Sequence, residues 1–331
     1  LPKVTTQLSK KVLLFKDNTP KEVRVNVTSH VEKFNGLVTL KTPVDWSFNP
    51  KNYKVKIEKI GETKEYIFNV NPPDGNKTGF FSSLVTEDKK SHIFSLDKIY
   101  YPHISKQYLL TPNKTRVSKV DIKFKVKKVA YLKGAGDKIV ESLENIGIKV
   151  TEFDVENLRL ETILPFPTLI VGIRAFNINN DLKFKNKILW DYVKKGGTLI
   201  VQYNTSRGLD SSIVAPYPIN LSRDRVTDEN ADVKFLIKDH PILNHPNKIS
   251  SKDFEGWVQE RGLYFPRAWD KKYQAVLSMS DNGEEEKKGS LLVADYGKGK
   301  FIYTGLSFFR ELPEGVPGAY RLFLNLISYG K

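Results

Sequence analysis

The polar side chains best suited to bind a ligand stand just after apolar runs of the chain. Arg174 and Asn177 follow one such run, Tyr203 and Asn204 follow a second, and Arg310 follows a third. A guanidinium group forks to a carboxylate, and amides and hydroxyls bond to polar ligands. Ligands of open α/β sheets bind beyond the carboxyl ends of the strands. We therefore expect these residues to line a crevice at that edge of a sheet.

A second group of candidates lies in the segment 256–264, where Trp257 and Tyr264 flank Glu260 and Arg261. Aromatic rings stack on sugar faces, while charged groups bond to sugar hydroxyls. This composition suits the recognition of a polar ligand. The complete set of candidate ligand-binding residues is Arg174, Asn177, Tyr203, Asn204, Trp257, Glu260, Arg261, Tyr264, Arg310 and Glu311.

Two of these candidates, Glu260 and Glu311, allow an alternative function. A glycan hydrolase uses two carboxyl groups as acid and base, and both must face one pocket within roughly 10 Å. The Arg174 side chain also has two possible roles. Its guanidinium could bind a ligand carboxylate, or it could form an internal salt bridge with Glu260 or Glu311. The sequence leaves these alternatives open, and it contains no complete catalytic constellation.

Two other motifs favour structural roles. Gly134-Ala135-Gly136 invites a dinucleotide-binding interpretation, since glycines there let the backbone approach a pyrophosphate. The third glycine is replaced by Ile139, and Asp137 suits the start of a helix better than it suits a phosphate. Tyr203-Asn204-Thr205-Ser206 could expose a hydroxyl nucleophile, but it lacks the Gly-x-Ser-x-Gly pattern of a nucleophile elbow. We predict a capped turn and a capped loop.

Metal and thiol chemistry have little support in the sequence. His240 and His245 are five residues apart and each precedes a proline, whereas a pair of metal ligands on a helix needs a spacing of four. The chain has no cysteine, which excludes disulfides, Cys-ligated zinc, iron–sulfur clusters and thiolate nucleophiles. We expect no cofactor in this chain.

The composition limits the class of protein and its partners. The chain of 331 residues is long enough for two domains. Its net charge of +15 comes from lysines spread along alternating runs, which is typical of solvated sheet faces and argues against nucleic-acid binding. No apolar run is long enough to span a bilayer. Because the sequence begins at Leu1, we expect a processed chain or a piece of a larger protein.

The amino-terminal third has the pattern of an all-β domain. Short alternating runs separated by Pro, Gly and Asn predict antiparallel strands over residues 12–15, 23–27, 37–40, 53–57, 65–70 and 80–85. Trp46 is expected to fill the core. About seven strands at this spacing are typical of an immunoglobulin-like β-sandwich, which we assign to residues 1–119.

The remainder, residues 120–331, has the pattern of an α/β domain. A long strand is predicted over 120–126, running into 129–132, and further strands over 150–155, 168–173, 198–203, 274–279, 289–294 and 300–305. Helices are predicted between them, around 139–146, 182–193 and 319–327. Apolar strands that alternate with helices favour a three-layer, flavodoxin-like fold with a mixed, mostly parallel sheet.

Several segments resemble a known family. They are 134–137 (GAGD), 170–177 (IVGIRAFN), 196–204 (GGTLIVQYN) and 303–313 (YTGLSFFRELP). Together they resemble the carboxyl-terminal region of Bacteroidetes-type PIG-L (LmbE-like) deacetylases. In such proteins a zinc-dependent amino-terminal domain removes an acetyl group from an N-acetylglucosamine-type sugar. A β-sandwich and a domain similar to class I glutamine amidotransferases follow it.

The resemblance implies a non-catalytic role for this chain. The His-Pro-Asp-Asp zinc motif of the deacetylase is absent, so zinc is expected only in a preceding domain. The amidotransferase cysteine is also absent, and Tyr203-Asn204 stands at the place we assign to its elbow. The chain would be an accessory, carbohydrate-recognition region whose partners are its own catalytic domain and a glycan, in the periplasm or outside the cell. A purely structural spacer is the remaining alternative.

Overall fold

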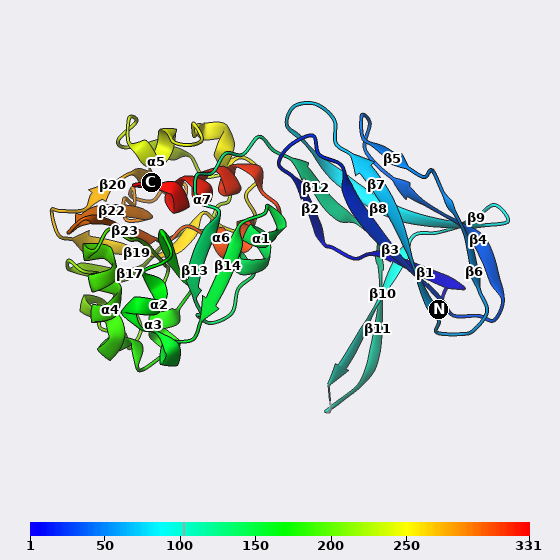
Figure 1. The fold of residues 1–331 in the computed structure, drawn as a ribbon, viewed down its shortest axis with the longest axis horizontal. Helices are drawn as coiled ribbons and strands as arrows, with labels where there is room; N and C mark the ends of the chain where they lie inside the picture. The colour runs from blue at the N-terminus through cyan, green and yellow to red at the C-terminus, as the bar shows by residue number, and fades with distance from the viewer. Residues whose placement is uncertain (102) are drawn as a thin grey trace. The chain divides into compact units, whose positions relative to one another are not determined.

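The computed structural model describes residues 1–101 and 103–331, and the fold contains more strand than helix. Contacts between Cα atoms divide the chain into a first unit, Leu1–Asp121, and a second unit, Ile122–Lys331. This division lies two residues after the predicted boundary. Figure 1 shows the elements of both units.

The first unit consists of strands. They are β1 (Val4–Leu8), β2 (Val12–Phe15), β3 (Lys21–Ser29), β4 (Phe34–Lys41), β5 (Ser47–Asn49), β6 (Tyr53–Ile57), β7 (Thr63–Asn71), β8 (Lys77–Glu87), β9 (Lys90–His92), β10 (Phe94–Tyr101), β11 (Ile104–Pro112) and β12 (Thr115–Lys119). One sheet has the order β1-β3-β7-β5, and another has the order β2-β12-β8-β4-β6 with β9 beside β8. Strand pairs are antiparallel except β2 with β12, which is parallel.

The core of the first unit explains its alternating sequence. In β3 the buried residues are Val23, Val25, Val27 and Ser29, while the residues between them face outward. Trp46 is buried as predicted, with its ring edge-on to Phe15 at 5.0 Å and to Phe81 at 5.1 Å. Aromatic pairs in this geometry stabilise a core beyond their buried area.

Strands β10 and β11 form a separate antiparallel hairpin, which extends away from the other strands of this unit (Figure 1). Leu96 lies opposite Leu110 and Asp97 lies opposite Leu109. Successive residues of a strand point to opposite faces. Because Leu109 and Leu110 are 49% and 40% exposed, both faces of the hairpin meet solvent.

The second unit contains a mixed sheet and its helices. The strands are β13 (Lys128–Leu132), β14 (Lys149–Phe153), β15 (Thr168–Val171), β16 (Thr198–Gln202), β17 (Ile219–Val226), β18 (Val233–Phe235), β19 (Gly262–Trp269), β20 (Gln274–Ala275), β21 (Leu277–Met279), β22 (Leu291–Tyr296) and β23 (Gly299–Thr304). The helices are α1 (Ile139–Asn145), α2 (Leu160–Ile163), α3 (Ala175–Ile178), α4 (Leu182–Lys194), α5 (Pro241–Asn244), α6 (Phe308–Glu311) and α7 (Pro317–Ser328), with the 3₁₀ turns η1 (Val155–Asn157), η2 (Ser211–Ile213) and η3 (Ser251–Phe254).

The main sheet of this unit has the order β14-β13-β15-β16-β23-β22-β20. The pairs from β14 to β23 are parallel, and β22 and β20 are antiparallel to their neighbours. The predicted mixed, mostly parallel sheet is thus confirmed. The pairs β17–β19 and β18–β21 lie outside it.

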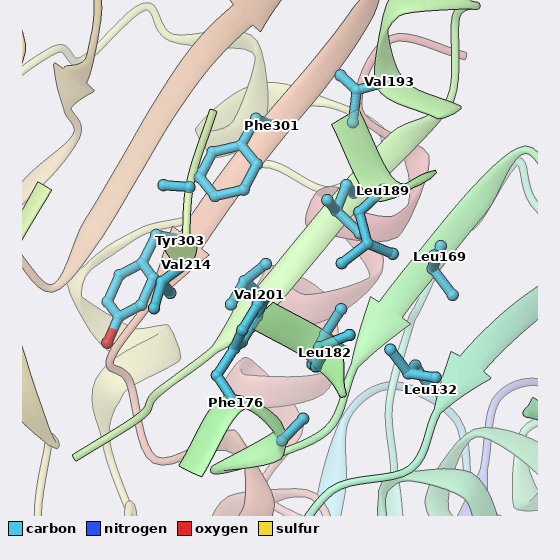
Figure 2. Close-up of a cluster of buried hydrophobic side chains, with 14 of the residues drawn as sticks. Leu132, Leu169, Phe176, Leu182, Leu189, Val193, Val201, Val214, Phe301 and Tyr303 are labelled. Atoms are coloured by element: carbon cyan, nitrogen blue, oxygen red, sulfur yellow. The ribbon is translucent and has the colours of Figure 1, made fainter. Parts of the chain in front are cut away.

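The main sheet is covered by helices on both faces. Leu182 and Leu189 of α4 pack with Leu169 and Val201 of the sheet in one buried cluster (Figure 2). Thr168 precedes Leu169 in β15 and therefore points to the other face, where its hydroxyl donates to the carbonyl oxygen of Ile327 in α7 at 2.7 Å. Strands buried on both faces are mainly apolar, as the Leu-Ile-Val runs of β15 and β16 show.

One predicted strand is wrong. Residues 120–127 form no strand, and β13 begins at Lys128. The backbone of Lys123 instead exchanges two hydrogen bonds with the side chain of Asn247, each 2.9 Å long, and the N–H of Lys125 donates to the Ser328 hydroxyl. Side chains thus satisfy backbone groups that a strand partner would otherwise satisfy.

Candidate functional site

The central parallel strands bring several predicted residues to one edge of the sheet. Val171 of β15 pairs with Val201 of β16, which in turn pairs with Tyr303 of β23. The strands end in register, so the residues that follow them lie at the same edge. Arg174 and Tyr203 meet there, and the backbone N–H of Arg174 donates to the carbonyl oxygen of Tyr203 at 2.8 Å.

Tyr203 lies at the centre of an aromatic group. Its ring is stacked on that of Tyr264, with centroids 6.0 Å apart and planes 9° apart, and it contacts Phe309 at 5.1 Å. Burial raises the pKa of Tyr203, while the charges of Arg174 and Arg310 oppose that rise. The phenol is therefore neutral and able to donate at physiological pH.

Arg310 binds the neighbouring segment. Its Nε donates to Oε1 of Glu260 at 2.9 Å, its Nη1 donates to the side-chain oxygen of Gln259, and its guanidinium lies over the Phe309 ring at 4.8 Å. Glu260 thus pairs with Arg310 and not with Arg174. We call this group the Tyr203 cluster: Arg174, Tyr203, Gln259, Glu260, Tyr264, Phe309 and Arg310.

The segment that carries Gln259, Glu260 and Tyr264 is tied to the end of β23. The N–H of Leu263 donates to the carbonyl oxygen of Gly305 at 2.9 Å, and the Ser307 hydroxyl donates to that of Glu260 at 2.6 Å. A Cβ on Gly305 would lie 2.8 Å from the carbonyl oxygen of Leu263, so only glycine allows this approach.

Backbone strain is concentrated in the Tyr203 cluster. Arg174, Gln259 and Tyr264 have φ angles of 54°, 68° and 53°. Within the described part of the second unit, they are the non-glycine residues with positive φ. The left-handed conformation costs about 1–2 kcal/mol for a residue with a Cβ. Such strain gathers at active sites and ligand clamps.

Asn177 and Asn204 were predicted to line the site, but they hold its loops. The Asn177 amide donates to the carbonyl oxygen of Thr205 at 3.0 Å and accepts from its N–H at 2.9 Å. Asn204 is fully buried, where it accepts from the N–H of Phe176 and donates to the carbonyl oxygen of Gln202. Both amides are satisfied by backbone groups, so they position the turns that carry Arg174 and Tyr203.

Trp257 and Arg261, predicted to bind a ligand, are instead internal. The Trp257 Nε1–H donates to the carbonyl oxygen of Asp253, and only 3% of the residue is exposed. Arg261 donates to the carbonyl oxygens of Ala231 and Phe254, and burial lowers its pKa. These side chains donate to backbone carbonyl oxygens that have no partner in a regular helix or strand.

Glu311 is also internal, which separates it from any substrate. It is 0% exposed, and its carboxylate accepts from the N–H of Val258 at 2.9 Å and from the Ser307 hydroxyl at 3.3 Å. Glu260 is engaged by Arg310. The two carboxylates do not form the accessible pair that the hydrolase alternative requires.

The elbow was expected at Tyr203-Asn204, but the strand-to-helix turn of that kind lies elsewhere. β15 leads through Gly172 and Ile173 to the strained Arg174 and directly into α3. β16 leads into a loop that reaches η2 only at Ser211. A nucleophile elbow is a sharp, strained turn from strand to helix. Arg174 occupies that position, and a guanidinium is no nucleophile.

The predicted capped turn after β13 is closed to a phosphate. Asp137 accepts from the N–H of Ile139 at 3.0 Å and from the N–H of Ile173 at 3.4 Å, and the Tyr131 hydroxyl donates to it at 2.5 Å. Its carboxylate thus takes the backbone N–H groups that a pyrophosphate would use.

The histidines of the predicted loop have structural partners. Nδ1 of His240 accepts from the N–H of Ile242 at 3.2 Å, so Nε2 carries the proton and donates to Oε1 of Gln274 at 3.1 Å. His245 precedes a cis peptide bond to Pro246. Across residues 1–101 and 103–331, no group of three or more His, Cys, Asp or Glu side chains is placed to hold a metal ion, and no helix of these residues is long and apolar enough to cross a membrane.

Three cavities of the second unit are lined by residues outside the Tyr203 cluster. They have volumes of about 570, 760 and 510 Å³ and are lined by residues around His240, around Arg267 and around Asp154, respectively. In the Tyr203 cluster, the central Tyr203 is only 7% exposed, whereas Arg174 and Gln259 are exposed. The sequence pattern missed Gln259 and Phe309, although Phe309 adjoins Arg310 in the segment after β23.

Comparisons with known proteins leave the family of this chain open. No family model and no curated protein matches it. Among solved structures it is similar to an exo-β-1,4-mannosidase, Op5Man5, from Opitutaceae bacterium strain TAV5, with 10% identity, a TM-score of 0.36 and coverage of 60% of this chain and 35% of that one. It is also similar to a protein of unknown function from Porphyromonas gingivalis W83, with 16% identity, a TM-score of 0.22 and coverage of 39% and 58%. A family 123 glycoside hydrolase from Clostridium perfringens has 9% identity, a TM-score of 0.22 and coverage of 61% and 38%. The chain thus spans about a third of the length of the mannosidase, and likenesses at this level carry no inference about its function.

Proposed function

We propose that the chain is a non-catalytic, carbohydrate-recognition region and that the Tyr203 cluster is its binding site. The observation that carries this proposal is the coincidence of strain and chemistry: Arg174, Gln259 and Tyr264 are strained in the same place where two tyrosine rings and an Arg–Glu pair meet. Rings with polar groups around them are suited to the apolar faces and hydroxyls of a sugar.

The parent protein and the detailed folds belong to the same proposal. We propose that the region is accessory to a larger LmbE-like deacetylase acting on an N-acetylglucosamine-type sugar, exported from the cytoplasm, with zinc in its preceding domain. The first unit would be an immunoglobulin-like sandwich. The second would be a flavodoxin-like, amidotransferase-type domain, which is supported by the order β14-β13-β15-β16-β23, since the second strand in sequence lies outside the first.

Titration calorimetry with N-acetylglucosamine oligomers tests the binding site. The intact chain is expected to bind at millimolar ligand or below, and Tyr264→Ala should weaken binding about tenfold, since stacking on a ring contributes about 1 kcal/mol or more. Tyr108→Ala is the matched control, because Tyr108 is 55% exposed in the β10–β11 hairpin.

Two results would contradict the proposal. If the intact chain binds neither these neutral oligomers nor an acidic oligosaccharide at millimolar concentration, the spacer alternative gains support. If Tyr108→Ala weakens binding as much as Tyr264→Ala does, the binding site lies outside the Tyr203 cluster.

A further inference from the structure

The positive charge of the Tyr203 cluster is only partly compensated. Arg174 and Arg310 contribute two positive charges, and Glu260 contributes one negative charge, which is held by Arg310. Both arginines act electrostatically on Tyr203. A net charge of about +1 therefore remains at the site, and it is carried by Arg174.

Arg174 forms no ion pair with any residue that the structure describes. In the described part of the chain, no carboxylate lies within ion-pair distance of its guanidinium, and the side chain is exposed. The residue nevertheless holds a left-handed backbone (φ 54°, ψ 21°) where glycine would be free of strain. An exposed side chain with no ion pair among the described residues, on a strained backbone, points to a contact with something outside the protein.

The neighbouring groups offer further hydrogen-bond donors. Arg310 uses Nε and Nη1 on Glu260 and Gln259, and its Nη2 makes no hydrogen bond within the described residues. The Tyr203 hydroxyl likewise has no protein partner among them. A planar guanidinium is matched best by a carboxylate.

We infer that the ligand of the Tyr203 cluster is a sugar acid, and that Arg174 binds its carboxylate while Tyr203 and Tyr264 contact the sugar. This inference rests on the proposed carbohydrate-binding function and names its ligand class. A neutral sugar would leave the Arg174 guanidinium to water. The net charge of +15 on the chain favours the approach of anionic glycans.

Calorimetry with three trisaccharides tests the inference on the intact chain. The probes are trigalacturonate, the same compound as its methyl ester, and the N-acetylglucosamine trisaccharide, with sodium acetate as the free carboxylate. The acid should bind at least tenfold more tightly than its ester, acetate should bind far more weakly than the acid, and added salt should weaken the acid alone.

Two variants locate the contact. Arg174→Gln should abolish the preference for the acid over the ester, whereas Arg159→Gln, which also removes an exposed charge, just before α2, should retain it. Circular dichroism should show both variants folded.

Each result has a defined meaning. Equal affinity for acid and ester, or an unchanged preference in Arg174→Gln, overturns the inference and leaves the proposed function standing. Acetate binding as tightly as the acid also overturns it, since the sugar would then contribute nothing. If no trisaccharide binds, both the inference and the proposed function fail.

Discussion

Arg174 occupies a backbone conformation that glycine adopts without a steric cost, and its exposed side chain forms no ion pair in the described structure. Natural proteins retain such residues where function opposes stability. The residue that binds the ligand would then be one that weakens the fold.

Arg174→Gly is therefore expected to raise the free energy of unfolding of the second unit by up to about 1 kcal/mol. The greater freedom of glycine in the unfolded chain offsets part of the relief. Urea denaturation measures the change, and Arg174→Lys, which retains the Cβ, should leave stability unchanged. A less stable glycine variant would mean that the arginine side chain stabilises the fold through contacts of its own.

One buried and two partly buried histidines predict a loss of stability in acid. Burial lowers the pKa of His30, His92 and His240 below the ordinary value of 6.5. The unfolded chain therefore takes up protons at a higher pH than the folded chain does, so the free energy of unfolding falls as the pH drops below about 6.5.

For the second unit this sensitivity should depend on His240. Urea denaturation at about pH 7.5 and about pH 5.5 should show a smaller difference in stability for His240→Gln than for the natural sequence. An identical difference in the two proteins would show that protonation of His240 is not coupled to unfolding.

At the level of elements, strand and helix positions follow from local patterns, whereas several site contacts do not. The apolar runs predict β2, β6 and α4 closely, because period-two and helical patterns record which face is buried. β10 and β11 escaped prediction because an exposed hairpin has no buried face to impose alternation. Residues 120–126 were predicted as a strand because nothing local reveals that Asn247 satisfies their backbone.

Some residues of the candidate site could likewise be predicted from the sequence, and others could not. The rule that ligands bind at the carboxyl ends of strands brought Arg174, Tyr203 and Arg310 into consideration. It could not exclude Trp257 or Glu311, because their burial depends on how the segment 254–264 packs on the end of β23. That packing is set by hydrogen bonds between residues distant in sequence.

The close packing of the turn after β13 can be tested by substitution of Gly134. A Cβ on Gly134 would lie 2.2 Å from the carbonyl oxygen of Ile173 and 2.7 Å from the carbonyl carbon of Gly172, and these backbone atoms cannot move aside as a flexible side chain could. Gly134→Ala should lower the free energy of unfolding of the second unit by about 2 kcal/mol or more, as measured by urea denaturation. Ala135→Ser, at an exposed neighbour, is the control, and equal stability of both variants would contradict this packing.

At the level of the whole molecule, each unit has a hydrophobic core of its own. Trp46, Phe68 and Phe81 belong to one buried cluster in the first unit, and Leu169, Leu189 and Phe301 belong to another in the second. A compact unit with its own core is a candidate for independent folding.

A fragment of residues 1–121 is therefore expected to unfold cooperatively in urea, with a midpoint close to that of the first unit in the intact chain. Intrinsic fluorescence can follow it, because Trp46 is the tryptophan of this fragment. A fragment that lacks a cooperative transition would show that the first unit depends on the rest of the chain.

The β10–β11 hairpin has a consequence for the distribution of local stability. Its interstrand hydrogen bonds are bordered by exposed side chains such as Tyr100 and Tyr108, whereas those of β3 and β7 adjoin the buried core of the first unit. An isolated two-stranded ribbon is marginally stable in water. Its amide protons are thus expected to exchange with solvent deuterium through local opening, well before the cooperative unfolding that releases the amides of β3.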